Sequence, residues 1–113
     1  MVDQSVVISV RNYLQKLNEN GLNVIFGVVF GSQVKGNTNE WSDIDLLVVS
    51  SLFDGQLTRQ NASLLWRIAA RTESRIEPIP CGLRQWEEDD SSAIVEIARR
   101  EGEKIALFDE KKK

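Results

Sequence analysis

The sequence predicts an α/β (α+β) domain in which helices flank a small mixed sheet. Segments with apolar residues at helical spacing alternate with β-branched and apolar runs, a pattern typical of helices packed on a sheet. The length of 113 residues is that of one domain, so we expect a single domain over residues 1–113. A hydrophobic content of 42% is enough for one small core.

The first two elements are a helix and a buried strand. Gly21 is placed to end the helix, which we expect over residues 4–20. The strand is expected over residues 22–30, because LNVIFGVVF is rich in β-branched and aromatic side chains and is followed by glycine. The apolar face of the helix is formed by Val6, Val7, Val10, Leu14 and Leu17.

A polar connector then leads into a second strand. Residues 31–41 are rich in glycine, asparagine, serine and threonine, and they leave room for one helical turn at their start. Residues 43–49, DIDLLVV, predict the second strand. Residues 51–58 predict a loop, and apolar spacing predicts a helix over residues 57–73.

The last third of the chain predicts a strand, a helix and a short final strand. Residues 75–81, RIEPIPC, contain two prolines that cannot donate to a ladder, so this strand should lie at an edge or be irregular. The helix is expected to be capped from Asp90 or Ser91 and to close at Gly102. Residues 104–108, KIALF, predict the fourth strand.

Charge and hydropathy exclude several classes of protein. The net charge of −3 argues against a protein that holds nucleic acid by bulk electrostatics. The chain has no apolar run of about eighteen residues and no charged-then-apolar N-terminus. We therefore expect no membrane span, no signal peptide and a cytoplasmic location.

Histidine and cysteine usage narrows the chemistry further. Histidine is absent, which excludes serine-histidine and cysteine-histidine catalysis and histidine-ligated zinc. The single Cys81 cannot form an internal disulfide or a multi-cysteine zinc site, and we interpret it as a small apolar residue near a strand end. Acid–base or metal chemistry must therefore use carboxylates, hydroxyls, lysine or metal-bound water.

Two carboxylates mark the start of the second strand. Because side chains alternate along a strand, Asp43 and Asp45 share one face, which Leu47 and Val49 continue as apolar residues. Two like charges in such a place are costly unless a cation is bound, and hard oxygen ligands suit Mg²⁺. A carboxylate pair can also hold two metal ions, an arrangement used to transfer phosphoryl or nucleotidyl groups.

The turn after the first strand is suited to binding phosphate. Gly31 leaves the strand and Ser32 opens a turn that directs backbone N–H groups and a hydroxyl outward. Lys35 and Gly36 follow at a distance that adds a charge and a second bend, although an ordinary exposed lysine is the alternative for Lys35. A phosphate site beside a metal site suits a nucleoside triphosphate chelated to Mg²⁺.

A metal site of this kind is expected to use a third carboxylate, and Glu77 is the best candidate. It lies between Ile76 and Pro78 on the third strand, where a charged residue needs a reason. The alternative is an exposed glutamate on an edge strand.

These residues together resemble a known signature. Gly31-Ser32, then ten residues, then Asp43-x-Asp45 resembles the motif of the polymerase-β-like nucleotidyltransferase superfamily. The chain most resembles its minimal nucleotidyltransferases, small stand-alone prokaryotic members, over roughly residues 22–107. GSQVKG is similar to their phosphate-binding turn, SDIDLLV to their metal-binding strand, RIEPIP to the strand of their third carboxylate and EIARREG to their closing helix. The resemblance implies the nucleotidyltransferase fold.

The resemblance implies a role for each matching residue. Asp43 and Asp45 would bind two Mg²⁺ ions, one of them bridging the triphosphate of ATP, and Glu77 would help to hold the ion that activates an acceptor hydroxyl. Gly31 and Ser32 would hold the β- and γ-phosphates while the α-phosphate is attacked and pyrophosphate leaves. The family often has aspartate at the third position, and glutamate offers the same oxygens on a side chain longer by one methylene.

The resemblance also implies a reaction and a partner. The reaction is transfer of a nucleoside monophosphate, foremost AMP from ATP, to a hydroxyl. Minimal nucleotidyltransferases are often encoded beside a helical HEPN-domain protein and in some pairs act as its antitoxin. We expect the acceptor to be such a partner or to be held by a second copy in a homo-oligomer. The alternatives are a partner-binding antitoxin without catalysis and a domain that binds nucleotide without turnover.

Three tryptophans and two charged runs have simpler interpretations. Trp41 could stack on a base, but we interpret it, like Trp66 and Trp86, as a packing residue. We interpret residues 87–90, EEDD, as a solvated acidic stretch at the start of a helix rather than as metal ligands. Residues 110–113, EKKK, are expected to be a solvated tail.

Overall fold

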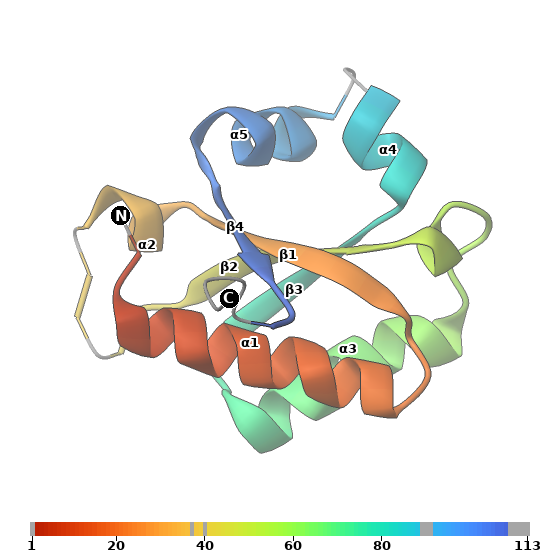
Figure 1. Ribbon diagram of the computed structural model, residues 1–113, viewed down its shortest axis with the longest axis horizontal. Coiled ribbons are helices and arrows are strands. Elements are labelled where there is room, and N and C mark those ends of the chain that lie inside the picture. Colours follow the sequence, from red (N-terminus) through yellow and green to blue (C-terminus); the bar gives the residue numbers. More distant parts are fainter. Residues whose placement is uncertain (1, 37, 40, 89–91, 109–113) are drawn as a thin grey trace.

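Four strands form one mixed sheet in the order β3-β2-β1-β4 in a computed structural model that describes residues 2–36, 38–39, 41–88 and 92–108 (Figure 1). β1 pairs antiparallel with β2 and with β4, whereas β2 pairs parallel with β3. The strands are β1 (Val24–Phe30), β2 (Ile44–Ser50), β3 (Ile76–Cys81) and β4 (Glu103–Ala106). The predicted α/β class and small mixed sheet are confirmed.

Helices cover both faces of this sheet (Figure 1). On one face lie α1 (Gln4–Glu19) and α3 (Arg59–Thr72), and on the other lie α4 (Leu83–Glu88) and α5 (Ala93–Glu101). Two short turns complete the described elements, the helical turn α2 (Ser32–Lys35) directly after β1 and the 3-10 turn η1 (Ser51–Phe53) directly after β2. None of the helices in the described part of the chain is long and apolar enough to cross a bilayer.

β2 carries apolar side chains into a cluster on each face of the sheet. Ile44, Leu46 and Val48 belong to the cluster that includes residues of α1 and α3. Leu47 and Val49 belong to the cluster that includes Val95 and Ala98 of α5. The alternation predicted for this strand is therefore confirmed, and it leaves the aspartate face of β2 on the side of α4 and α5.

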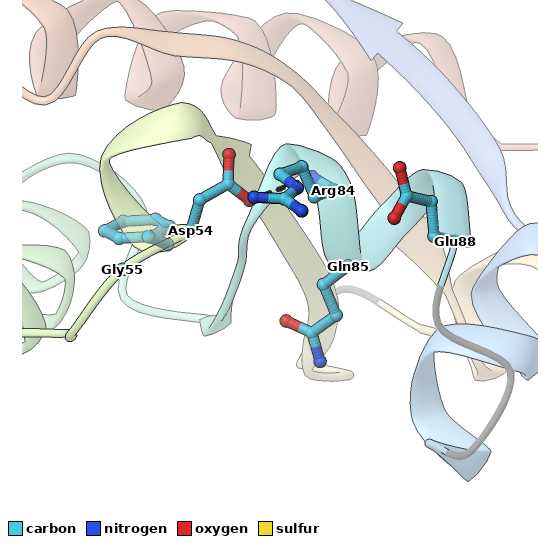
Figure 2. A pocket seen from close by; sticks show the side chains of 6 residues that line it. Asp54, Gly55, Arg84, Gln85 and Glu88 are labelled. Atoms are coloured by element: carbon cyan, nitrogen blue, oxygen red, sulfur yellow. Dashed lines mark hydrogen bonds between the residues drawn. The ribbon is translucent and has the colours of Figure 1, made fainter.

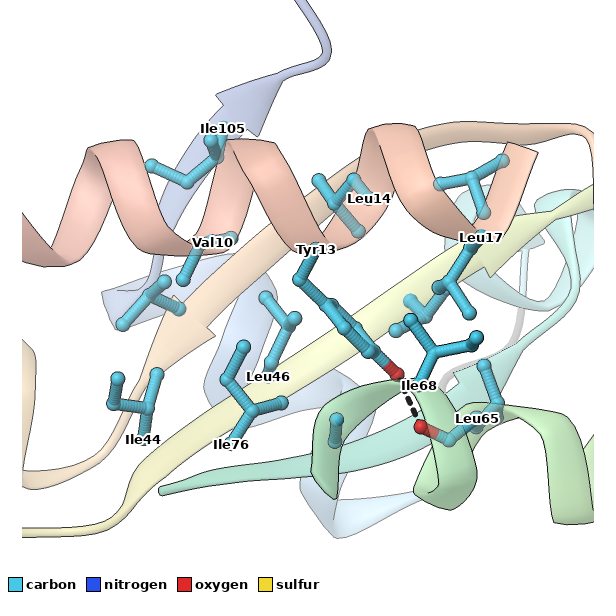
Figure 3. Packing of buried hydrophobic residues seen from close by; sticks show 14 of the residues in the cluster. Val10, Tyr13, Leu14, Leu17, Ile44, Leu46, Leu65, Ile68, Ile76 and Ile105 are labelled. Atoms are coloured by element: carbon cyan, nitrogen blue, oxygen red, sulfur yellow. Dashed lines mark hydrogen bonds between the residues drawn. The ribbon is translucent and has the colours of Figure 1, made fainter. Parts of the chain in front are cut away.

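The larger cluster contains one buried phenol (Figure 3). Tyr13 of α1 points toward α3, and its hydroxyl donates a hydrogen bond of 2.8 Å to the carbonyl oxygen of Leu65. Burial of the phenol raises the pKa of Tyr13. This polar link joins the two helices that cover one face of the sheet.

Several sequence predictions about the elements are confirmed. The first helix ends at Glu19, and Gly21 adopts a φ of +90° just beyond its cap. β3 is an edge strand, as its prolines predicted, and Cys81 is its buried last residue. Trp86 packs as predicted, because its ring meets that of Phe26 edge-on at a centroid distance of 5.6 Å.

Other predictions are wrong. Trp41 is 80% exposed and Trp66 is 55% exposed, so neither is a packing residue. The last helix is capped by Ser92, whose side chain accepts a hydrogen bond from the backbone N–H of Val95, whereas the predicted caps Asp90 and Ser91 lie outside the described residues. Helix α3 begins at Arg59 rather than at residue 57.

The acidic run at residues 87–90 is only half described. Glu87 and Glu88 are exposed at the end of α4, a short helix that the sequence pattern did not predict, rather than at the start of a helix. Residues 89–90 and the predicted tail at residues 110–113 lie outside the described residues.

Candidate active site

The end of β1 and the starts of β2 and β3 meet at one edge of the sheet. In the antiparallel pair, Phe30 lies opposite Asp45, and in the parallel pair Asp45 lies beside Glu77. Phe30, Leu47 and Cys81 share the apolar cluster on that face. Because side chains alternate along strands, Asp45 and Glu77 emerge side by side on the face covered by α4 and α5.

Gly31 stands directly against Asp45. Its φ of +78° and ψ of −143° belong to a region of backbone conformation that is essentially reserved for glycine. A Cβ atom on Gly31 would lie 2.5 Å from Oδ2 of Asp45, so any side chain here would force the carboxylate to move away. Both the turn and the close approach of the carboxylate therefore require glycine at this position.

The predicted helical turn after β1 is present as α2. The backbone N–H of Val34 donates to the carbonyl oxygen of Gly31 at 3.2 Å, and that of Gly36 donates to the carbonyl of Ser32 at 3.1 Å. Gly36 ends the turn in the left-handed conformation, with a φ of +80°. Ser32 and Lys35 are exposed, so the hydroxyl and the ammonium group are accessible from solvent.

The three predicted carboxylates interact with one another. A hydrogen bond with Asp43 raises the pKa of Glu77, and burial and the charges of both aspartates raise it further. Burial raises the pKa of Asp45, and the charge of Asp43 adds to this effect. The structure thus brings together Asp43, Asp45 and Glu77, the acids predicted from the sequence, and their negative charges repel one another.

The donor set fits a hard divalent cation in its chemistry. All of its side-chain donors are carboxylate oxygens, and a bound cation would relieve the repulsion that raises the pKa values of Asp45 and Glu77. Across the described ranges, however, no three acidic, cysteine or histidine side chains are already arranged to hold one metal ion together. Binding through all three acids therefore requires rotation of side chains, which costs little for the exposed Asp43.

Gln33 is a residue of this site that the sequence did not reveal. It belongs to α2, yet its side chain is only 4% exposed. Its amide Nε2 donates to the carbonyl oxygens of Ser42 at 3.3 Å and of Asp43 at 3.1 Å. A glutamine in a polar turn carries no sequence signal of burial, because its partners lie about ten residues further along the chain.

Two cavities lie near the ends of β2. One, of about 320 Å³, adjoins Gln33 and the segment before Asp43, and it is lined by Asp3, Ser5, Val6, Gln33, Thr38, Asn39 and Arg75. The other, of about 500 Å³, lies at the opposite ends of β2 and β3 and is open to solvent (Figure 2). There Asp54 accepts a hydrogen bond of 2.8 Å from the backbone N–H of Arg84. None of the three carboxylates Asp43, Asp45 and Glu77 lines either cavity, although Gln33 lines the smaller one.

Comparison with known families defines the class of this protein. Residues 9–112 match the family model of the nucleotidyltransferase domain, so the chain belongs to the nucleotidyltransferase domain family. This agrees with the resemblance to minimal nucleotidyltransferases seen in the Gly31-Ser32 and Asp43-x-Asp45 motif. No curated protein matches the chain significantly.

Solved structures share the fold at low sequence identity. A Sulfolobus solfataricus protein assigned as a nucleotidyltransferase is 13% identical, with a TM-score of 0.56 over 94% of this chain and 82% of that chain. A toxin–antitoxin structure with AMP-PNP is 18% identical, with a TM-score of 0.56 over 89% of this chain and 74% of that one. A variant of the toxin–antitoxin pair MntA–HpeT is 17% identical, with a TM-score of 0.54 over 89% and 74%.

Proposed function

We propose that the chain is a Mg²⁺-dependent nucleotidyltransferase that transfers AMP from ATP to a hydroxyl group of a HEPN-type partner protein, for which it acts as an antitoxin. The observation that carries the proposal is the meeting of Asp43, Asp45 and Glu77 with the Gly31-Ser32 turn at one edge of the sheet. The family supplies the class of reaction. The metal, the nucleotide and the acceptor belong to the proposal.

In this proposal the three acids bind the metal ions and the residues of the α2 turn bind the phosphates. Asp43, Asp45 and Glu77 would hold two Mg²⁺ ions, which when bound neutralise the charge of the triphosphate and of the transition state. Gly31 has no side chain to block the close approach of a phosphate, and the exposed Ser32 hydroxyl donates to a phosphate oxygen. Lys35 adds a positive charge from the same turn, which ends at Gly36.

The reaction exchanges a phosphoanhydride linkage of ATP for a phosphate ester linkage to the acceptor. The acceptor hydroxyl oxygen forms a bond to the α-phosphorus of ATP, and the bond from that phosphorus to the oxygen bridging to the β-phosphate breaks. Pyrophosphate leaves with the bridging oxygen, and the hydroxyl proton passes to the carboxylate cluster. The chain's contribution is to hold the phosphates in place and to stabilise charge, since phosphoryl chemistry is limited mainly by positioning and electrostatics.

Two structural neighbours support the nucleotide and the partner. One is a toxin–antitoxin structure with AMP-PNP, an analogue of ATP. The other is an MntA–HpeT variant in which two aspartates two positions apart are replaced by glutamate. Asp43 and Asp45 have the same spacing in this chain.

The proposal is tested by transfer of a radiolabel from the α-phosphate of ATP, and then of GTP, CTP and UTP, in the presence of Mg²⁺. The protein is assayed with and without the product of the neighbouring gene. The double variant Asp43→Asn/Asp45→Asn is compared with Glu87→Gln/Glu88→Gln, which changes the net charge equally on exposed residues of α4. We expect label on the partner with the wild type and with the control, and none with the aspartate variant. Equal labelling by the aspartate variant would contradict the proposal.

A second candidate is an antitoxin that binds its partner without catalysis. It is favoured by one observation, that no three ligands in the described part of the chain are pre-arranged around a metal position. In that case Asp43→Asn/Asp45→Asn should bind and neutralise the partner as well as the wild type does, with no label transferred by either. A homo-oligomer that completes the acceptor site is tested in the same experiment by labelling of the chain itself.

A further inference from the structure

Two polar side chains are buried among the described residues, Gln33 at 4% and Ser50 at 0% exposure. The side chain of each contacts two backbone carbonyl groups, and the two residues lie at opposite ends of β2. At the end of the strand, the Oγ atom of Ser50 lies 2.8 Å from the carbonyl oxygen of Leu22 and 3.1 Å from that of Asn23, and its single hydrogen is shared between them. Gln33 donates to the carbonyls of Ser42 and Asp43, in the segment that leads into the strand.

The contact made by Gln33 lies just beyond the point where the pairing of β1 with β2 ends. β1 pairs with β2 only as far as Phe30 and Asp45, because the chain turns away at Gly31. The carbonyls of Ser42 and Asp43 therefore lie beyond this ladder, at a half-buried position where a backbone acceptor still needs a donor. The Gln33 amide supplies the donor from the turn that takes the place of β1.

The same contact also fixes α2, which has only four residues. A helix of this length has no stability of its own, because nucleation costs more than one turn of hydrogen bonds returns. Its position relative to the sheet must come from tertiary contacts, and Gln33 is the residue of α2 whose buried side chain reaches the aspartate segment. Both acceptors are carbonyl oxygens, so the NH₂ group of the amide must face them.

We propose that Gln33 is a positioning residue that couples the phosphate-binding turn, residues 31–36, to the metal-binding segment, residues 41–45. Movement of either segment is transmitted to the other through this buried amide. Phosphate held at Ser32 and a metal ion held at Asp43 are thereby kept at a fixed separation. The functional part of this inference rests on the proposed function, whereas the structural coupling does not.

The coupling is tested with Gln33→Met, which fills similar space but cannot donate, and with Ser50→Ala as a matched control. Both variants lose a buried polar side chain that hydrogen-bonds to backbone carbonyl groups, and both should be less stable than the wild type. Hydrogen exchange of backbone amides is followed at residues 31–36 and 41–45. We expect Gln33→Met to raise exchange in both segments together, and Ser50→Ala to leave both unchanged relative to the remainder of the sheet.

Binding of Mn²⁺-ATP, measured by electron paramagnetic resonance, gives the functional readout. We expect Gln33→Met to weaken Mn²⁺-ATP binding and to lower kcat by about tenfold or more, because small misplacements of reacting groups cost one to two orders of magnitude. Ser50→Ala should keep the wild-type affinity and kcat at a temperature where it is fully folded. If Gln33→Met does not fold, Gln33→Asn, shorter by one methylene, is used and should show the same pattern.

The outcomes separate the coupling from the proposed function. If exchange and Mn²⁺-ATP affinity respond equally to Gln33→Met and Ser50→Ala, Gln33 is merely structural and the inference is overturned. If the wild type binds no Mn²⁺-ATP and transfers no nucleotide, the proposed function fails. In that case exchange at residues 41–45 in Gln33→Met still decides whether Gln33 holds the aspartate segment.

Discussion

Replacing Gly31 by alanine tests the geometry of the carboxylate site most sharply. The new Cβ atom would lie 2.5 Å from Oδ2 of Asp45, about 1 Å closer than ordinary van der Waals contact allows. The backbone of Gly31, at a φ of +78° and ψ of −143°, would also be strained by about 1–3 kcal/mol with any side chain. The variant should therefore lose stability and move the Asp45 carboxylate.

The displacement of Asp45 should be visible in the reaction. A shift of about 1 Å in a catalytic group lowers the rate by roughly two orders of magnitude. We expect Gly31→Ala to reduce the unfolding free energy in urea by about 1–3 kcal/mol. We also expect it to reduce nucleotidyl transfer by about 100-fold at a temperature where the protein remains folded.

Gly21→Ala is the matched control. Gly21 has a φ of +90°, but nothing lies within 4 Å of the place its Cβ would take, and it follows α1 rather than the site. It should lose about 1–2 kcal/mol of stability through backbone strain and keep its transfer rate. If Gly31→Ala and Gly21→Ala retain equal transfer rates, the close approach of Asp45 to the turn has no role in the chemistry and the reasoning is refuted.

Three further changes test the electrostatics and packing. Burial and the charge of Asp43 raise the pKa of Asp45. The ionised Asp45 carboxylate therefore destabilises the folded state at a pH above its folded pKa. This penalty vanishes when the pH falls below the ordinary pKa of aspartate. Asp45→Asn should thus keep or raise the melting temperature at pH 7 in EDTA. It should also abolish the stabilisation by Mg²⁺, which for the wild type is about 1.4 kcal/mol of unfolding free energy when Mg²⁺ is at ten times its Kd. The pKa of Glu73 is lowered chiefly by a hydrogen bond from Arg75, whose Nε lies 2.9 Å from the carboxylate. The ionised Glu73 therefore stabilises the folded state at pH 7, and this stabilisation is lost as the pH falls through its folded pKa. Glu73→Gln should cost about 1 kcal/mol in urea unfolding at pH 7 and nothing at about pH 2, and a difference that persists in acid would contradict this origin. Tyr13→Phe should cost about 1 kcal/mol by removing the hydrogen bond to the Leu65 carbonyl, while transfer stays at the wild-type rate. An unchanged unfolding free energy would show that the bond is dispensable.

The sequence predicted those features of the site that depend on local pattern. Alternation along one strand placed Asp43 and Asp45 toward the same side, and a glycine at the end of a buried run predicted the turn at Gly31. Glu77 was predicted from its setting between apolar residues on a short strand, and the parallel register places it beside Asp45. These features follow from strand periodicity and glycine stereochemistry, which act over a few residues.

The features that the sequence did not predict depend on contacts between distant segments. Gln33 is buried only because the segment before β2 folds back over α2. Trp41 was interpreted as packing because indole is apolar, yet no core lies beside it and it is 80% exposed. Helix α4 has no buried residues and six residues in all, so it shows no apolar period for a pattern to detect.

The proposed function requires that the α-phosphate of the nucleotide, and not the γ-phosphate, is transferred. It is tested most directly by comparing ATP labelled at the α-phosphate with ATP labelled at the γ-phosphate, using the wild type, Mg²⁺ and the partner encoded by the neighbouring gene. We expect covalent label on the partner from α-labelled ATP and none from γ-labelled ATP, because pyrophosphate is the leaving group. Label from the γ-position, or from neither, would contradict it.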